Sequence, residues 1–214
     1  MVEDKDLMKT GTTTVALFCK DGIVLCADKR VTSGYLVAHK KYEKIVKITD
    51  EMAVTVAGVV SDVQLLTKLI KAELKLKDIR TGRKATVKEA ANLLANIVYG
   101  NIRKFSAIPG ISHFVLGGVD DAGFHIYDIS PDGSMTDSDD YTSSGSGSVM
   151  AYGVLETLYK KDISVEEGVK LGVKAINAAV QRDIASGGGV DVVAITKAGV
   201  KKILSREIIV KLEA

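Results

Sequence analysis

The sequence has few of the residues on which metal and thiol chemistry depend. Its 214 residues include only two cysteines, Cys19 and Cys26, and the three histidines His39, His113 and His125 are scattered along the chain. Neither residue type has the spacing of metal ligands, so no metal site and no cofactor are expected. We favour two reduced, buried cysteines in a cytoplasmic protein over a disulfide between them.

Long apolar runs and strong net charge are also missing. No run approaches the ~20 apolar residues of a membrane-spanning helix, and the opening "MVEDKDLMKTG" is too charged for a secretory signal. The net charge of +2 is too small to favour nucleic acid or an anionic membrane as partner. Basic residues between Lys71 and Lys84 alternate with acidic ones and lack aromatic neighbours, which indicates a solvated helix face.

Several catalytic motifs are absent as well. The chain has no GxxxxGK[ST] phosphate-binding loop, no G-x-S-x-G nucleophile elbow and no Cys/His pair in a familiar context. The segment "SSGSGS" at 143–148 lacks the lysine of a phosphate loop, although its backbone amides could bind an anion. An anion-binding or ligand-binding domain therefore stays open as an alternative to an enzyme.

What is present is a globular composition, with 46% hydrophobic and 26% charged residues and no linker or repeat, which favours a single domain. The first third reads as strands of β-branched and apolar residues. An Asp21–Gly22 dipeptide predicts a hairpin turn between the first two of them. The expected strands of this part of the chain are "TTTVALFCK", "GIVLCADKR", "KYEKIVKIT" and "MAVTVAGVV".

Helices are predicted next, because three pairs have the capping-box form that satisfies the free amides of a helix start. These pairs are Ser61 and Gln64, Thr86 and Glu89, and Ser164 and Glu167. A fourth helix is expected in "VMAYGVLETLYKK". Strand patterns lie between and after the helix pairs without strict alternation, so we expect an α+β protein with largely antiparallel sheets.

Threonine is the remaining candidate nucleophile, and "KTGTTTV" places Thr12 directly after Gly11. A threonine hydroxyl is a weak nucleophile unless a base accepts its proton. The free amine of an N-terminal threonine, with a pKa of about 7.7–8.0, is such a base. Thr12 would therefore have to be exposed by removal of residues 1–11. Otherwise Gly11 is simply a flexible start to the first strand.

Six motifs occur in order along the chain: "TGTTTV", "ADKRVTSG", "HKKYEKI", "VAGVVSD", "SSGSGS" and "QRDIASGGGVDV". Together they give the chain a resemblance to the β subunit of the proteasome, most closely the archaeal type. The resemblance runs from Thr10 to about Leu204. It implies the fold of the N-terminal-nucleophile hydrolases, a four-layer α/β/β/α sandwich of two antiparallel sheets flanked by helices.

The resemblance also implies roles for individual residues. Thr12 would be the nucleophile, Lys44 would lie beside its hydroxyl, and Asp28 would orient Lys44. Gly58 would supply an oxyanion-hole amide, and a polar cluster of Ser146, Asp183 and Ser186 would hold the amine of Thr12. The implied substrate-binding residues, which predict cleavage after hydrophobic residues, are Val31, Thr32, Tyr42, Val46, Val56 and Val60.

The placement of Lys44 supports its role independently of the resemblance. In a strand, Lys44 would share one face with Tyr42, Val46 and Ile48, where an ordinary lysine is not expected.

As the resemblance implies, residues 1–11 would be a leader removed by autocatalysis, and residues 12–214 one hydrolase domain. The partners would be other β subunits in a seven-membered ring, α subunits in a stacked four-ring barrel, an ATPase regulatory ring, and unfolded polypeptide as substrate. Two alternatives remain within this family. The chain could be a silent β-ring subunit that keeps its leader, or a relative of the bacterial two-tier threonine peptidase, although the opening "TGTTTV" favours the proteasome.

Overall fold

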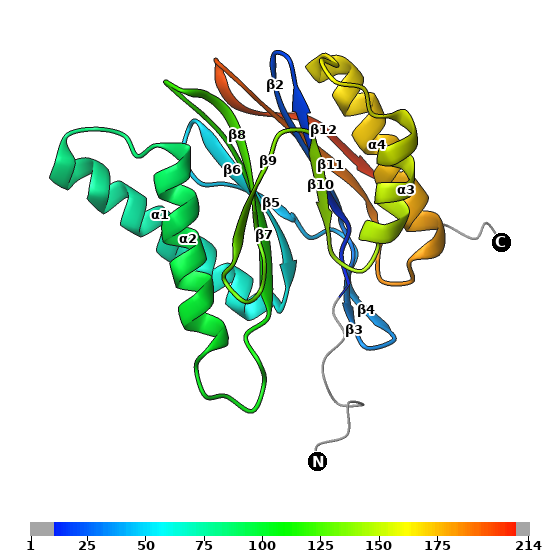
Figure 1. Cartoon of the computed structure of the whole chain (residues 1–214). Helices are drawn as coiled ribbons and strands as arrows, with labels where there is room; N and C mark the ends of the chain where they lie inside the picture. Colours follow the sequence, from blue (N-terminus) through cyan, green and yellow to red (C-terminus); the bar gives the residue numbers. More distant parts are fainter. Residues whose placement is uncertain (1–10, 209–214) are drawn as a thin grey trace.

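The structure is a computed structural model that describes residues 11–208. Figure 1 shows two sheets packed face to face, with α1 and α2 covering one and α3 and α4 covering the other. This arrangement is the predicted four-layer α/β/β/α sandwich, so the expected fold class is confirmed. The helices are α1 (Val60–Thr81), α2 (Val87–Ile102), α3 (Ser148–Leu158) and α4 (Val165–Arg182).

Both main sheets are antiparallel and five-stranded. Sheet I has the order β10-β1-β2-β11-β12, sheet II has the order β5-β6-β7-β8-β9, and β3 and β4 form a separate hairpin. The strands are β1 (Thr14–Cys19), β2 (Gly22–Asp28), β3 (Val31–Ser33), β4 (Leu36–His39), β5 (Ile45–Lys47), β6 (Met52–Gly58), β7 (Ser112–Asp120), β8 (Gly123–Ile129), β9 (Met135–Ser138), β10 (Tyr141–Ser144), β11 (Gly189–Thr196) and β12 (Gly199–Glu207).

Three apolar clusters correspond to the three interfaces between the four layers. The cluster between the sheets includes Leu25 of sheet I and Val115 of sheet II. The outer face of sheet I packs on α3 and α4, and that of sheet II packs on α1 and α2. Burial of these residues supplies the main stabilisation of the sandwich. The site described below lies where β1 and β6 reach the end of the central interface.

The predicted turn between β1 and β2 was one residue out of place. Cys19 pairs with Gly22, so Lys20 and Asp21 form the turn and Gly22 belongs to β2. Position 22 is a glycine because β11 approaches it closely. A Cβ atom there would lie 2.4 Å from the carbonyl oxygen of Ile195. The glycine is therefore required by strand packing rather than by the turn.

The strand predicted over residues 41–49 is much shorter than expected. Only Ile45–Lys47 forms β5. The residues before it lie instead beside the end of β2, where the Tyr42 amide donates to the Lys29 carbonyl at 2.9 Å. Lys44 nevertheless has a buried side chain, as the alternation predicted. Its ammonium group points to Asp28 rather than to solvent.

Two of the three predicted capping boxes are present, at Thr86 with Glu89 and at Ser164 with Glu167. The third prediction was wrong, because Val59 is the N-cap of α1 and makes no side-chain hydrogen bond. The amide of Val59 donates to the carbonyl of Ile111, which fixes the N-cap two residues before Ser61. Ser61 therefore lies inside the first turn of the helix.

Cys19 and Cys26 are both free and buried, as expected. They lie against α4, and a Cβ atom at Gly172 would be 2.3 Å from the Cys26 sulfur. Burial raises the pKa of the Cys19 thiol to about 12 and raises that of Cys26 further, so both stay protonated and unreactive. No helix within residues 11–208 is long and apolar enough to cross a membrane.

Candidate active site

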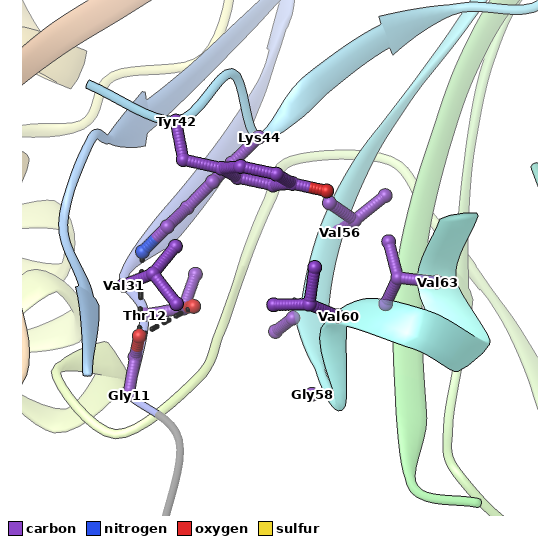
Figure 2. Close-up of a pocket in the computed structure, with 10 residues that line it drawn as sticks. Gly11, Thr12, Val31, Tyr42, Lys44, Val56, Gly58, Val60 and Val63 are labelled. Atoms are coloured by element: carbon purple, nitrogen blue, oxygen red, sulfur yellow. Dashed lines mark hydrogen bonds between the residues drawn. The ribbon is translucent and has the colours of Figure 1, made fainter. Parts of the chain in front are cut away.

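The candidate site lies between the two sheets, at the ends of β1 and β6. Thr12 stands two residues before β1 and is 5% exposed, whereas Gly58 ends β6 in the opposite sheet. Figure 2 shows Thr12 and Gly58 on opposite sides of one pocket. Its lining residues are Gly11, Thr12, Val31, Tyr42, Lys44, Val56, Ala57, Gly58, Val60 and Val63.

The peptide bond between Gly11 and Thr12 is the centre of this site. The Thr12 hydroxyl donates to the carbonyl oxygen of Gly11 at 2.7 Å, and the Lys44 ammonium donates to the same oxygen at 3.3 Å (Figure 2). The Thr12 amide donates to the Ser146 hydroxyl at 3.3 Å. A threonine hydroxyl and a lysine ammonium group thus both lie at one backbone carbonyl.

Asp28 joins Lys44 to the backbone around Thr12. One carboxylate oxygen accepts from Lys44 Nζ at 2.7 Å and from the Thr13 amide at 2.9 Å. The other accepts from the amides of Arg30 at 3.0 Å and Gly187 at 2.9 Å. These four donors compensate for the complete burial of the carboxylate and fix its orientation.

Lys44 is a buried cation whose charge depends on its surroundings. Burial lowers the pKa of its amine, and the carboxylates of Asp28 and Asp183 partly oppose this effect. The Arg30 guanidinium lowers the pKa of Lys44 further. An amine with a lowered pKa exchanges protons more readily near neutral pH than a surface lysine does.

The three residues of the predicted polar cluster come together in the structure. Ser146 and Ser186 each donate a hydroxyl hydrogen bond of 2.6 Å to the same oxygen of Asp183. Ser186 is also 2.6 Å from the Thr13 hydroxyl. The cluster therefore holds the chain on both sides of the Thr12 amide.

The "SSGSGS" segment forms the connection from β10 to α3 and packs on this part of β1. A Cβ atom at Gly145 would lie 2.1 Å from the Thr12 carbonyl oxygen, and one at Gly147 would lie 2.0 Å from the Thr13 hydroxyl. Its glycines thus allow two backbone segments to approach closely. The segment therefore packs against Thr12 and Thr13 rather than forming a separate anion-binding loop.

Gly58 occupies a position that other residues could not take without strain. Its φ is +119°, and an added Cβ atom would lie 2.2 Å from the carbonyl oxygen of Ile111. This conformation places bare backbone along the pocket wall facing Thr12 (Figure 2). A substrate backbone could approach it closely.

The structure separates the six predicted substrate-binding residues into two groups. Val31, Tyr42, Val56 and Val60 line the pocket. Val46 is not among the lining residues and packs instead against the core under α1 and α2. Thr32 is not among the lining residues, and its hydroxyl accepts from the Gly11 amide at 3.2 Å.

Several residues that form the pocket or hold Asp28 were not predicted from the sequence. Ala57 and Val63 also line the pocket, and the first could have been noticed beside Gly58 in "VAGVV". The Gly187 and Arg30 amides that hold Asp28 carry no side-chain signal and could not have been predicted from residue type. Among the described residues, no three His, Cys, Asp or Glu side chains converge in a way that could hold a metal ion.

The four-layer sandwich of two antiparallel sheets is the fold of the N-terminal-nucleophile hydrolases. The family described as "Proteasome subunit" matches residues 8–195. The chain belongs to this proteasome subunit family.

Relatives with the name "Proteasome subunit beta" confirm the resemblance to the archaeal type. The protein from Ferroglobus placidus is 46% identical over 97% of this chain and 96% of its own length. The one from Methanocaldococcus vulcanius is 45% identical, over 97% of this chain and 91% of its own length. The one from Archaeoglobus fulgidus is 44% identical, over 92% and 90% respectively.

Proposed function

We propose that this chain is a catalytic β subunit of a proteasome core particle and a threonine-type endopeptidase. The observation that carries the proposal is the 2.7 Å hydrogen bond from the Thr12 hydroxyl to the Gly11 carbonyl. In this arrangement the nucleophile already lies at the group it would attack. Lys44 and Asp28 are placed to support the same reaction.

The first reaction is removal of the leader, residues 1–11, of which residues 1–10 lie outside the described part of the chain. Thr12 Oγ1 forms a bond to the Gly11 carbonyl carbon, and the bond from that carbon to the Thr12 nitrogen breaks. The hydroxyl proton ends on this nitrogen, which becomes an amine. Water then hydrolyses the resulting ester, releasing the leader as a carboxylate and restoring the Thr12 hydroxyl.

The mature enzyme would use the amine that this reaction exposes. The amine accepts the Thr12 hydroxyl proton as the hydroxyl attacks a substrate carbonyl, and it returns the proton to the leaving amine. Ser146, within 3.3 Å of the Thr12 nitrogen, is placed to orient this amine together with Asp183. The Gly58 amide would stabilise the oxyanion.

Substrate preference follows from the pocket beside Thr12. Among its lining residues, Val31, Val56, Val60 and Val63 are aliphatic, and the Lys44 ammonium group is paired with Asp28. Transfer of an apolar side chain into this pocket is favoured by up to a few kcal/mol, about 25 cal/mol per Å² buried. We therefore expect cleavage after hydrophobic residues.

Membership of the family supports a further part of the proposal, the assembly. The chain would form a seven-membered β ring with other β subunits, stacked against α rings in the cytoplasm. An ATPase ring would deliver unfolded polypeptide to it.

The main rival is a silent β subunit that keeps its leader. The Thr12→Ala variant tests the choice, because it retains the fold but lacks the nucleophile. Intact-mass measurement should find the leader removed from the wild-type protein and retained in Thr12→Ala, which should also lack peptidase activity. A leader retained in both proteins would support the silent subunit.

An anion-binding domain is disfavoured by the packing of 143–148 on Thr12 and Thr13. It would predict ligand binding that does not depend on Thr12 and no hydrolysis of peptides.

A further inference from the structure

Two consecutive residues at the end of β2 form two separate buried ion pairs. Asp28 pairs with Lys44 at 2.7 Å, and Lys29 pairs with Asp191 of β11 at 3.0 Å. All four side chains are at most 6% exposed. Because consecutive residues of an extended chain point to opposite sides, Asp28 faces Thr12 while Lys29 faces away from it.

A third cation connects the two pairs on the side away from Thr12. Lys202 of β12 lies 3.5 Å from the Asp191 carboxylate and 2.7 Å from that of Glu43. Glu43 is the residue directly before Lys44. The peptide bonds Asp28–Lys29 and Glu43–Lys44, together with these ion pairs, therefore link the six residues in a closed ring. This ring includes the pair of Asp28 and Lys44. We call Lys29, Glu43, Asp191 and Lys202 the rear clamp.

The rear clamp acts on a segment that has little regular structure of its own. Residues 40–44 lie between β4 and β5 and belong to neither strand. One backbone bond links this segment to the end of β2, from the Tyr42 amide to the Lys29 carbonyl at 2.9 Å. Lys29 also donates its amide to the Gly187 carbonyl at 2.9 Å. Lys29 is therefore the point at which the segment, β2 and the loop before β11 meet.

The contacts of Lys29 do not explain its burial through substrate chemistry. Within the described residues, its ammonium group donates to Asp191 and to Ser205, both at 3.0 Å, and to no group of the Thr12 site. A buried ion pair is a weak contribution to stability, because desolvation offsets most of the attraction. The Lys29–Asp191 pair is better explained by geometry, since an ion pair with hydrogen bonds fixes the relative orientation of its two side chains and an apolar contact does not.

We propose that the rear clamp positions Lys44, holding its ammonium group against Asp28 and the Gly11 carbonyl. This inference rests on the proposed function, because it concerns the same reaction of Thr12. The four residues are positioning residues and touch neither the nucleophile nor the scissile bond. The pair of Lys29 and Asp191 carries most of the effect, since Glu43 and Lys202 are largely exposed and exposed pairs contribute little.

The consequence for the reaction concerns both rate and pH. If the clamp is lost, Lys44 moves away from Asp28 and from the Gly11 carbonyl, and displacements of about 1 Å can cost up to about 100-fold in rate. The charged groups acting on Lys44 are Asp28, Asp183 and Arg30. With Asp28 farther away, burial and Arg30 would lower the pKa of Lys44 further, so the alkaline limit of the reaction moves to lower pH.

The decisive variant replaces the buried pair rather than breaking it. Lys29→Met with Asp191→Leu removes both charges together, and such replacements are often neutral for folding. We expect the double variant to fold and to remove its leader about 10-fold or more slowly than wild type. Its alkaline limit should lie at lower pH. Leader removal with wild-type rate and pH profile would overturn the proposal.

One comparison separates positioning from general destabilisation. Leu94→Ala removes a buried side chain from α2, far from the clamp in the fold, and should lower Tm without moving the pH profile. Should Leu94→Ala move that profile as the double variant does, positioning by the clamp is refuted. The proposed function is judged separately, because its failure would appear as an inactive wild-type protein, whereas failure of the clamp leaves wild type and double variant equally active.

Discussion

Thr12 donates its hydroxyl hydrogen bond to the carbonyl oxygen of Gly11, 2.7 Å away and directly before it in the chain. The same oxygen accepts from Lys44, which is held by the buried carboxylate of Asp28. A hydroxyl, a cation and a fixed anion thus converge on one peptide bond. Local chain flexibility does not explain this convergence, because Lys44 and Asp28 come from segments 16 or more residues away.

Replacement of the buried cation Lys44 should slow the reaction strongly. Lys44→Met removes a donor to the Gly11 carbonyl, and loss of such a donor typically costs about 100- to 1000-fold in rate. The variant also leaves Asp28 buried without its cation, which costs about 3–5 kcal/mol of folding stability. Leader removal followed by mass spectrometry, together with chemical denaturation, measures both effects.

Lys47→Met is the matched control for this substitution. Lys47 lies on β5 three residues further on and pairs with Asp50 at the surface. It should change neither the rate nor the stability appreciably, since exposed pairs contribute about 0–1 kcal/mol. Equal activity of Lys44→Met and Lys47→Met would remove Lys44 from the mechanism.

The two reactions should differ in their pH dependence. Peptide hydrolysis needs a neutral amine on Thr12, so its rate should rise with pH through about 7.7–8.0. Leader removal occurs before this amine exists and should lack that acidic limb. Both reactions use the charged form of Lys44, whose pKa is lowered by burial. Both rates should therefore fall with rising pH before an ordinary lysine would lose its proton.

Rates of processing and of peptide hydrolysis, measured from pH 5 to about 10, test this difference. An acidic limb near 8 in leader removal would mean that some group other than the freed amine is responsible for it.

A methyl group at Gly58 should disable the site. In Gly58→Ala the added atom would lie 2.2 Å from the Ile111 carbonyl oxygen, so the backbone around the proposed oxyanion amide has to move. We expect processing and hydrolysis to fall about 100-fold or more.

Gly123→Ala is a matched control because Gly123 has a similar φ, +125°, with no atom within 4 Å of the added methyl group. It should lose about 1–3 kcal/mol of stability through backbone strain and keep full activity. If Gly58→Ala were as active as Gly123→Ala, the oxyanion role of Gly58 would be untenable.

A charge placed in the pocket should change the substrate preference. Val60→Lys adds a cation to a wall formed largely by valines, which disfavours apolar P1 side chains and favours acidic ones. We expect the ratio of kcat/KM for glutamate over leucine at P1 to rise about 10-fold or more. Val149→Lys, at an exposed position on α3, is the control and should leave the ratio unchanged. An unchanged ratio in Val60→Lys would place the P1 pocket elsewhere.

Local patterns in the sequence predicted the elements of the fold well. The capping boxes at Thr86 and Ser164 mark real helix starts because each depends only on residues three apart. Ser61 misled the same reasoning, since the start of α1 is set by a hydrogen bond between Val59 and the distant Ile111. The order of strands and helices predicted the largely antiparallel sheets, whereas the four layers followed from the resemblance.

The site could be predicted as a set of residues but not as a geometry. Alternation along the chain indicated a buried Lys44, yet nothing in the local sequence pairs it with Asp28. The backbone amides that hold Asp28 have no sequence signature, because every residue except proline carries the same donor. Val46 was assigned to the pocket by the resemblance alone, and the structure instead packs it against the core under α1 and α2.

The most direct test of the account is the N-terminal sequence of the protein purified in its peptide-hydrolysing assembly. We expect the active chain to begin at Thr12, with the Thr12→Ala protein retaining the leader and showing no hydrolysis. An assembly that hydrolyses peptides while all of its copies of this chain still carry residues 1–11 would contradict the account.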